Sequence, residues 1–342
     1  MRGCCATLMW SFRRPSQETT RCDDPLNRDR QGIRRTMEIR RVCVVGAGTM
    51  GAEIAKWAVQ GGYEVAIQDV SETIVRKVVD RIHETLLRGV PEQDTWHLMV
   101  EALKLEHPEF FEGLSVPDIS PEQLEYLVHA MKGTTNLDDA CRDADIVIEA
   151  VFEDISLKQG IFRKLDAMCP SHTILASNSS TIMISRLAVQ TGRPDRCIGM
   201  HFMGPMPLVE VIRGTATSDS TVRNIVKLAR DMGKKPIVLN KEWPGFVANS
   251  VSGGGGREAH WLLEKKIATV EQIDDIAITG LGYIRGPFMV EDFVGLDVIH
   301  DAQVSIFEQT GDPMDKPSPL LEEKLNRGEL GMKTGKGFYN WS

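Results

Sequence analysis

A glycine cluster at residues 46–51 constrains this chain more than any other feature of its sequence. The segment reads GAGTMG and has the spacing G-x-G-x-x-G. It follows an apolar run at residues 42–45 and opens a helical pattern at 49–61, which is the context that a dinucleotide-binding loop requires. The sequence therefore predicts a strand, a tight turn and a helix that together bind a nucleotide cofactor.

Each glycine of this loop has its own expected role. Gly46 would permit the tight turn, Gly48 would let the backbone approach a pyrophosphate, and Gly51 would allow the helix to pack closely on the strand. Thr49 and Met50 begin the helix, where free N–H groups and the helix dipole favour phosphate. From this loop alone, FAD remains an alternative to a nicotinamide cofactor.

Asp69 distinguishes between the nicotinamide cofactors. A second apolar run at residues 63–68 ends at Asp69, 18 residues beyond Gly51. A carboxylate there accepts hydrogen bonds from a ribose diol and repels a 2′-phosphate, so we expect NAD rather than NADP. The alternative is that the glycines only form a tight turn and that Asp69 only caps the next helix, for which Ser71 is the N-cap candidate.

Strand and helix patterns alternate along the next part of the chain and predict a parallel sheet. Residues 91–132 interrupt this rhythm with four prolines, and we interpret them as a helical insertion. The other expected elements are a helix from 71 to about 88, strands at 146–151, 173–176, 196–202, 208–213 and 236–239, and helices at 155–168 and 219–232.

The pattern becomes purely helical after a linker at residues 241–245, which contains a proline and a glycine. We therefore predict the α/β class: a Rossmann-type NAD-binding domain at 37–240, followed by a smaller all-α C-terminal domain at 241–342. The helices of this second domain are expected at 258–265, 270–279 and 291–309.

The first 36 residues differ from the rest, with eight arginines against four acids. We expect a disordered leader here, with folding beginning near Met37, in a cytoplasmic protein. The alternative is a mitochondrial transit peptide, because such peptides are rich in arginine, although they are poor in acids.

Charge and composition exclude several function classes. The net charge of −8 argues against a nucleic-acid partner, because such proteins need a basic surface. No run of 18 apolar residues exists, so we expect no membrane span. The seven cysteines lack a C-x-x-C pair, which is typical of reduced thiols. The eight histidines show no metal-ligand spacing, so we expect no metal site.

Further motifs resemble those of the 3-hydroxyacyl-CoA dehydrogenase family, in the family's order and over roughly residues 38–342. The resemblance implies NAD-dependent oxidation of an L-3-hydroxyacyl-CoA to the 3-ketoacyl-CoA, a step of fatty-acid β-oxidation. It also implies a homodimer held by the helical domain. After the glycine loop, the motifs are IVIEAVFEDISLK (146–158), ASNSS (176–180), GMHFMGPMPLVEV (199–211), WPGFVANS (243–250), GPFMVEDFVGLDV (286–298) and KTGKGFYNW (333–341).

The resemblance assigns the catalytic residues. His201 takes the position of the catalytic base and Glu210 that of the residue orienting it, while Ser180 and Asn249 would hold the substrate oxygen. The chemistry agrees, because alcohol oxidation removes a hydride and a proton, and histidine titrates in the range that suits a base. The alternative for His201 is a core histidine with satisfied hydrogen bonds, and for Glu210 it is a carboxylate at a strand edge. The alternative for Ser180 is the N-cap of a helix at 181–188, and for Asn249 it is an asparagine that ties the linker.

Glu153 and Lys158 match the family's E-x-x-x-x-K, which lines the cleft for cofactor and substrate. The alternative for Lys158 is a solvated helix lysine. CoA binding is less well marked: Thr85 stands where CoA-binding members tend to have serine, and the lysine that usually follows is missing.

Two further departures open other readings. Gly204-Pro205 replaces the family's Asn-Pro in a shortened segment, and glycines at 253–256 follow Asn249, as a loosened helix or a hinge. One rival is a dehydrogenase of a free 3-hydroxy acid such as carnitine or gulonate. Another is a nucleotide-binding or structural protein with impaired catalysis.

Overall fold

The computed structural model describes residues 38–89, 104–105, 108, 111–112, 114, 116–204 and 206–342. The predicted leader at 1–36 and most of the first part of the predicted helical insertion at 91–132 therefore lie outside the described residues. Of the insertion at 91–132, the last part is described and contains helix α4 (Pro121–Ala130).

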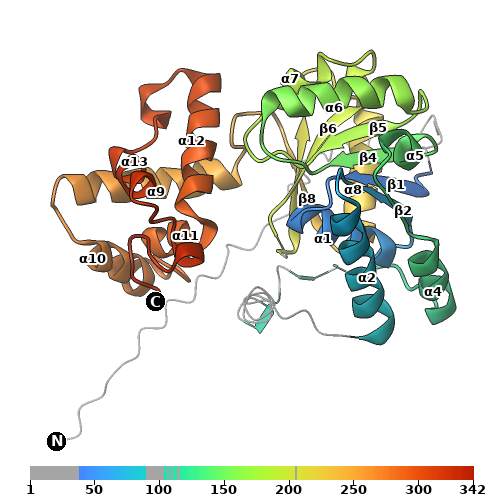
Figure 1. Ribbon diagram of the computed structural model, residues 1–342. Coiled ribbons are helices and arrows are strands. Elements are labelled where there is room, and N and C mark those ends of the chain that lie inside the picture. Colours follow the sequence, from blue (N-terminus) through green and yellow to red (C-terminus); the bar gives the residue numbers. More distant parts are fainter. Residues whose placement is uncertain are drawn as a thin grey trace, which may run out of the picture. The chain divides into compact units, whose positions relative to one another are not determined.

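One eight-stranded sheet with the strand order β3-β2-β1-β4-β5-β6-β7-β8 forms the first part of the chain (Figure 1). Its first six strands are parallel, because a helical crossover returns the chain between them. The strands are β1 (Arg41–Val45), β2 (Glu64–Gln68), β3 (Lys132–Thr134), β4 (Ile146–Glu149), β5 (Ile174–Ser177), β6 (Cys197–Phe202), β7 (Leu208–Arg213) and β8 (Lys235–Leu239).

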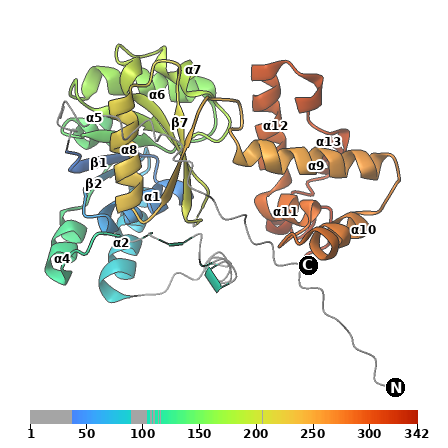
Figure 2. The same cartoon turned by 180° about the vertical axis from the view of Figure 1, so that it is seen from behind.

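Helices cover both faces of the sheet, as Figures 1 and 2 show from opposite sides. Alternate side chains of β1 face opposite layers. Cys43 and Val45 join the buried cluster under α5, α6 and α7, whereas α1 and α8 contact the sheet outside this cluster. These helices are α1 (Thr49–Gln60), α2 (Glu72–Arg88), α5 (Leu137–Cys141), α6 (Ile155–Met168), α7 (Ile184–Ala188) and α8 (Asp219–Asp231).

The predicted parallel sheet is present, but one edge of it departs from the parallel arrangement. Strands β6 and β7 are antiparallel, and β8 is parallel to β7. The link at 203–207 is too short for the helical crossover that a parallel pair needs, so the chain must reverse there. Strand β3 and helix α5 were not predicted, since β3 has only three residues and none of them is buried.

The remainder of the chain is helical, with three short turns. The predicted helix at 291–309 is divided at Gly295, whose φ of +106° ends one helix before the next begins. The elements are α9 (Ala248–Glu264), α10 (Val270–Asp275) with a π-helical turn (Ile276–Gly280), α11 (Pro287–Val294), α12 (Leu296–Thr310) and α13 (Pro319–Asn326). The turns η5 (Pro313–Asp315) and η6 (Met332–Thr334) are 3-10 helices, as is η3 (Pro194–Arg196), which lies before β6 in the first part of the chain.

The glycine tract at 253–256 lies inside helix α9, in agreement with the first of the two readings, a helix at these residues. Tertiary contacts explain one of its glycines. A Cβ on Gly256 would lie 2.7 Å from Oε1 of Glu291, whose other oxygen is 2.7 Å from Nε2 of buried His260. A Cβ on Gly255 would meet no atom within 4 Å. Nothing in the structure explains why residues 253–255 are glycine.

Candidate active site

The glycine loop has the geometry of a phosphate cradle. Gly46 has a φ of +102°, and a Cβ there would lie 2.6 Å from the carbonyl oxygen of Ala150. A Cβ on Gly51 would lie 1.8 Å from the carbonyl oxygen of Gly46. Gly48 is different, because a Cβ there meets nothing within 4 Å. Packing thus requires the first and third glycines, whereas the second leaves open space that a ligand backbone can approach.

The start of α1 and the end of β2 complete this cradle. Helix α1 has no side-chain cap on its N-terminus, so the N–H groups of its first turn remain for phosphate. Asp69 accepts hydrogen bonds from the N–H of Ala47 at 2.8 Å and of Ser71 at 3.2 Å. These bonds fix its partly exposed carboxylate beside the loop, where it can receive a ribose diol. The residues therefore fit a dinucleotide without a 2′-phosphate.

Two glycine-to-alanine changes are expected to have opposite consequences. Gly48→Ala leaves the melting temperature within about 2 °C but weakens NADH binding by roughly tenfold, because its methyl group enters the space for the pyrophosphate. Gly51→Ala prevents stable folding, because its Cβ overlaps the Gly46 carbonyl. Thermal unfolding and NADH fluorescence titration measure both effects, and unchanged NADH affinity in Gly48→Ala would contradict the cradle.

His201 and Glu210 are directly opposite each other on the antiparallel strands β6 and β7. Nδ1 of His201 lies 2.7 Å from Oε2 of Glu210. Both side chains are buried, at 4% and 3% exposure, so Glu210 is not the exposed strand-edge carboxylate of the alternative reading. Close pairing follows from the register, because side chains directly opposite on one face of a sheet lie next to each other.

The second carboxylate oxygen of Glu210 is also used. Oε1 accepts hydrogen bonds from the N–H groups of Val247 and Ala248, both at 3.0 Å, at the N-terminus of α9. Burial raises the pKa of Glu210, but the bonds from His201 and these N–H groups outweigh it, so the pKa is lowered overall. Glu210 is then ionised at neutral pH and accepts a hydrogen bond from the Nδ1–H of His201.

This arrangement leaves Nε2 of His201 as the reactive nitrogen. If Nδ1 carries the proton, Nε2 has a free lone pair. No side chain or backbone group among the residues that the structure describes hydrogen-bonds to Nε2. The ring of Phe246 packs against the imidazole, with centroids 5.6 Å apart. His201 and Glu210, called the dyad from here on, can therefore act as an oriented base.

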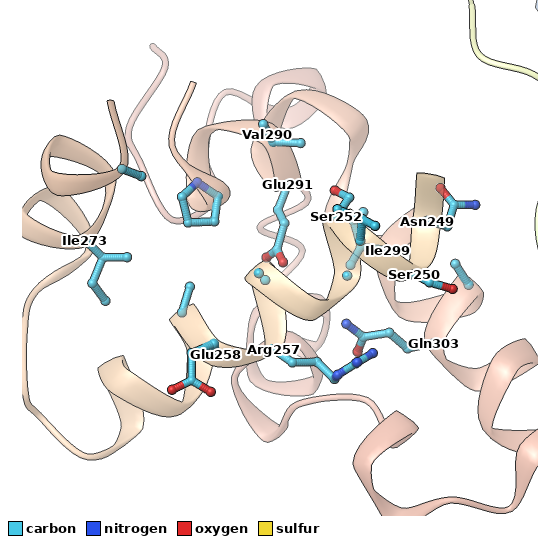
Figure 3. A pocket seen from close by; sticks show the side chains of 18 of the residues that line it. Asn249, Ser250, Ser252, Arg257, Glu258, Ile273, Val290, Glu291, Ile299 and Gln303 are labelled. Atoms are coloured by element: carbon cyan, nitrogen blue, oxygen red, sulfur yellow. The ribbon is translucent and has the colours of Figure 1, made fainter. Parts of the chain in front are cut away.

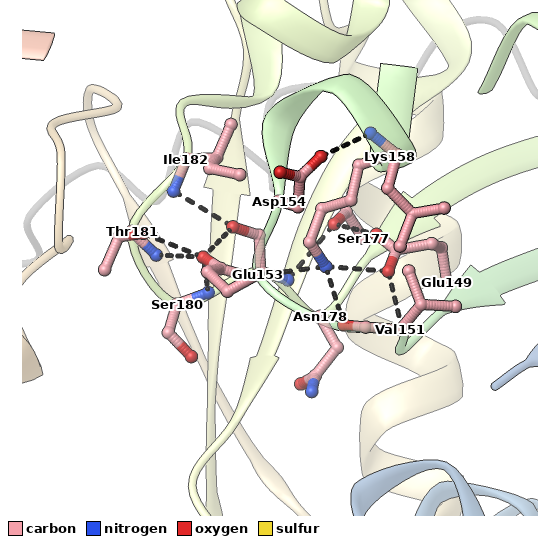
Figure 4. A network of polar contacts seen from close by, with 12 residues as sticks. Glu149, Val151, Glu153, Asp154, Lys158, Ser177, Asn178, Ser180, Thr181 and Ile182 are labelled. Carbon is pink, nitrogen blue, oxygen red and sulfur yellow. Dashed lines mark hydrogen bonds and ion pairs between the residues drawn. The ribbon is translucent and has the colours of Figure 1, made fainter. Parts of the chain in front are cut away.

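A buried ionic network connects the ends of β4 and β5 (Figure 4). Nζ of Lys158 lies 2.7 Å from Oε1 of Glu149 and 3.3 Å from Oε2 of Glu153, and it donates to the carbonyl oxygen of Val151 at 3.2 Å. Lys158 is 1% exposed, so the reading as a solvated helix lysine is wrong. Its ammonium is fully engaged by the protein, which favours a positioning role over direct contact with a ligand.

Glu153 holds the loop that follows β5. Its Oε1 accepts bonds from the N–H groups of Ser180 and Thr181 at 2.8 and 2.7 Å, and from the hydroxyls of Ser179 and Thr181 at 2.5 and 2.9 Å. Burial raises the pKa of Glu153, whereas Lys158 and these donors lower it, and the net shift is downward. An ionised Glu153 therefore fixes the backbone of the Ser180 loop.

Ser180 and Asn249 are in contact through the backbone of this loop. Nδ2 of Asn249 donates to the carbonyl oxygen of Ser180 at 3.0 Å, so Asn249 does tie the start of α9 to the loop. Ser180 is not an N-cap, because α7 begins at Ile184 and is preceded by Met183. The Ser180 hydroxyl has no hydrogen-bond partner within the described part of the chain, and it remains available to a substrate.

Comparison with known proteins decides the family. The model of the 3-hydroxyacyl-CoA dehydrogenase NAD-binding domain matches residues 41–243, and the model of the C-terminal domain of the same family matches residues 245–341. This chain belongs to the 3-hydroxyacyl-CoA dehydrogenase family. The predicted fold class is confirmed with it: an α/β NAD-binding domain of the Rossmann type followed by a helical C-terminal domain.

Several named relatives of this dehydrogenase span nearly the whole length. A probable 3-hydroxybutyryl-CoA dehydrogenase of Bacillus subtilis is 36% identical, over 89% of this chain and 98% of the relative. The human mitochondrial hydroxyacyl-coenzyme A dehydrogenase is 34% identical, over 89% and 91%. The crystal structure of (S)-3-hydroxybutyryl-CoA dehydrogenase from Ralstonia eutropha aligns with a TM-score of 0.74 and 34% identity, over 89% and 100%.

These findings establish the dehydrogenase as an NAD-dependent oxidoreductase, as predicted. None of its described helices combines the length and apolar character needed to cross a membrane. Within the same described residues, no group of three or more His, Cys, Asp or Glu side chains is placed to hold a metal ion.

Sequence reasoning missed Glu149 and Asn178 of this dehydrogenase, and it considered Ser177 only as an alternative hydroxyl to Ser180. Glu149 and Ser177 are adjacent in the β4–β5 register, and the Ser177 hydroxyl donates to Oε2 of Glu149 at 2.6 Å. Oδ1 of Asn178 accepts from the N–H of Phe202 at 2.9 Å and so connects the β5 loop to β6. An acid at the end of one buried strand and a serine at the end of the next were visible signals, because such ends meet at one edge of a parallel sheet.

Proposed function

We propose that His201 is the base that takes the hydroxyl proton of an L-3-hydroxyacyl-CoA, through its Nε2. The observation that carries this role is the 2.7 Å contact between Nδ1 of His201 and an ionised Glu210, with Nε2 left unpaired by the protein residues described. Glu210 holds the imidazole in one tautomer and stabilises the imidazolium that forms. The reverse reaction uses the same imidazolium as an acid.

The remaining roles divide between substrate and cofactor. The Ser180 hydroxyl and the Asn249 amide hold the substrate oxygen, and the Glu153–Lys158 pair keeps the Ser180 loop in place. Gly46, Gly48 and the first turn of α1 bind the pyrophosphate of NAD, and Asp69 its ribose. Bound NAD supplies the hydride acceptor. We propose a division into two domains at residues 240–245, where β8 has ended and α9 has not begun.

An acyl-CoA is the proposed substrate, because the named relatives are hydroxyacyl- and hydroxybutyryl-CoA dehydrogenases. A free 3-hydroxy acid is the less supported alternative. Loss of NADH absorbance with acetoacetyl-CoA, free acetoacetate and dehydrocarnitine distinguishes them. We expect kcat/KM to be at least about 100-fold higher for acetoacetyl-CoA, because binding energy from the CoA portion contributes to transition-state stabilisation. Turnover of a free keto acid alone would contradict this assignment.

We propose that the helical part forms a homodimer. A cavity of about 870 Å³ opens between α9, α10, α11 and α12, and Figure 3 shows part of its lining. Large apolar side chains on its walls are exposed, and such a surface on a monomer typically marks an interface. They include Trp243 (59% exposed), Val251 (73%), Ile276 (61%), Leu281 (67%) and Tyr283 (53%).

A matched pair of charge substitutions tests the homodimer. Val251→Glu is expected to lower the solution mass measured by sedimentation from that of two chains to that of one, because it places a charge in the apolar face. Val189→Glu is the control: Val189 is 72% exposed but lies at the end of α7, and this variant keeps the mass of two chains. A monomeric wild-type protein would refute the proposal.

We also propose a cytoplasmic location, which the four acids of residues 1–36 support.

A further inference from the structure

Lys234 is a buried lysine that the catalytic roles above do not use. It lies directly after the turn that ends α8, where Gly233 has a φ of +70°, and directly before β8. Its side chain is 5% exposed. Lysine is rarely buried in this way unless it is paired with an acid. The contacts of its ammonium group therefore need an explanation.

The ammonium of Lys234 contacts an aromatic face and one loop carbonyl. Nζ lies 3.4 Å from the centroid of the Trp57 ring in α1, as a cation–π contact. It donates to the carbonyl oxygen of Met206 at 3.1 Å. No carboxylate of the described residues forms an ion pair with the Lys234 ammonium. The nearby Glu53 instead pairs with Lys56 at 2.7 Å and with Arg81 at 3.6 Å.

Met206 belongs to the loop at 203–207 that joins the two strands of the dyad. Pro205 and Pro207 have no N–H group, so this loop can form few internal hydrogen bonds. The N–H of Met206 donates to the carbonyl oxygen of Met203 at 3.2 Å. The carbonyl oxygen of Pro207 accepts a hydrogen bond from the N–H of Lys235 at 2.6 Å. The hydrogen bond from Nζ of Lys234 adds a third contact, because it holds the carbonyl oxygen of Met206.

The same cluster reaches the residue beside the proposed base. The ring of Trp57 stacks on that of Phe202, with centroids 5.6 Å apart, and Phe202 follows His201 in β6. Lys234, Trp57 and Phe202 are thus in consecutive contact, and all three are buried. Displacing the ammonium would alter both the loop and the packing next to His201.

We propose that Lys234 is a positioning residue that clamps the 203–207 loop onto α1 and thereby fixes the end of β6 that carries His201. The inference rests on the proposed role of His201. Burial lowers the pKa of Lys234 from its ordinary 10.5 to about 7, with repulsion from Lys56 adding to it and Glu53 opposing it. An amine kept buried against this cost indicates that its hydrogen bond to the carbonyl oxygen of Met206 is used.

Two variants test the clamp, with an exposed lysine as control. Lys234→Met keeps an apolar stem on Trp57 but removes the donor and the charge, whereas Lys234→Arg restores both. Lys77→Met makes the same change at an exposed position of α2. We expect Lys234→Met to lower kcat for acetoacetyl-CoA reduction on the order of tenfold, with NADH affinity within about twofold, because the acceptor shifts relative to the base. Lys234→Arg should recover most of kcat, and Lys77→Met should match wild type.

Amide hydrogen exchange tests the clamp without activity. The peptide covering 203–210 should exchange several-fold faster in Lys234→Met than in wild type or Lys234→Arg, at equal protection of β1 and β4. Unchanged exchange, or equal loss of kcat in the Met and Arg variants, would overturn the proposal. If Lys234→Met does not fold, Trp57→Phe weakens the same cation–π contact and should shift exchange in the same direction. An inactive wild-type protein that passes the exchange test would refute the proposed reaction and not the clamp.

Discussion

Replacing His201 by alanine is expected to lower kcat for acetoacetyl-CoA reduction by roughly 100- to 10,000-fold, the range that a positioned acid–base group contributes. The physical reason is that Nε2 is the only atom of the dyad left for a substrate hydroxyl, because Nδ1 is bound to Glu210 at 2.7 Å. NADH affinity should stay within about twofold, since the glycine loop follows β1 and Asp69 follows β2, away from the strand that carries His201. Steady-state kinetics and fluorescence titration measure the two quantities separately.

Glu210→Gln tests the partner of this base. The amide has nearly the shape of the carboxylate but cannot stabilise an imidazolium by charge, so we expect a kcat loss of about 100-fold or more. The pKa of Glu210 is lowered in the fold, so its stabilising effect is present above its ordinary pKa of 4.5 and is lost as the pH falls below it. The Gln variant should therefore lose part of the acid dependence of stability.

Two other histidine–carboxylate pairs serve as controls. His172 is exposed and lies 3.1 Å from Asp145, and His172→Ala should leave kcat unchanged. His260 is buried and lies 2.7 Å from Glu291, as close as the dyad pair. His260→Ala should lower the melting temperature but not kcat below that temperature. A His201→Ala enzyme that keeps more than about a tenth of wild-type kcat would show that His201 is not the base.

Lys158→Met should strongly destabilise the protein, lowering the free energy of unfolding by about 3–5 kcal/mol. The cause is the uncompensated charge that remains on Glu149, which is 0% exposed and lies 2.7 Å from Nζ of Lys158. Removing one member of a buried ion pair lowers the free energy of unfolding far more than replacing both members does. Urea unfolding followed by circular dichroism measures the change.

A second variant separates the charge effect from simple loss of packing. Adding Glu149→Gln to Lys158→Met removes the buried charge, so more than half of the lost stability should return. Lys164→Met changes an exposed lysine of the same helix α6 and should lie within about 0.5 kcal/mol of wild type. A Lys158→Met protein that is as stable as Lys164→Met would contradict the structural role of this network.

Local patterns were sufficient for most of the strands and helices. Helix α6 (Ile155–Met168) and strand β7 (Leu208–Arg213) begin and end where they were predicted. Their signals are local: α6 starts at a side-chain cap on Asp154, and four of the six residues of β7 are buried. Strand β3 gave no such signal, since it has only three residues and becomes regular by pairing with β2.

The sequence by itself determined the nucleotide loop, the choice of NAD and the family, and it pointed to His201 and Glu210, because each depends on residue types at short or ordered spacings. Only the tertiary structure decided how these residues lie relative to one another. The antiparallel register of β6 and β7 brings the dyad into contact, and the N-terminus of α9 supplies two N–H groups to Glu210 from 37 and 38 residues away. Burial decided the rest, because a lysine in the sequence can equally be solvated or enclosed. In the fold, Lys158 is enclosed among carboxylates and Lys234 lies against Trp57, which is remote in sequence.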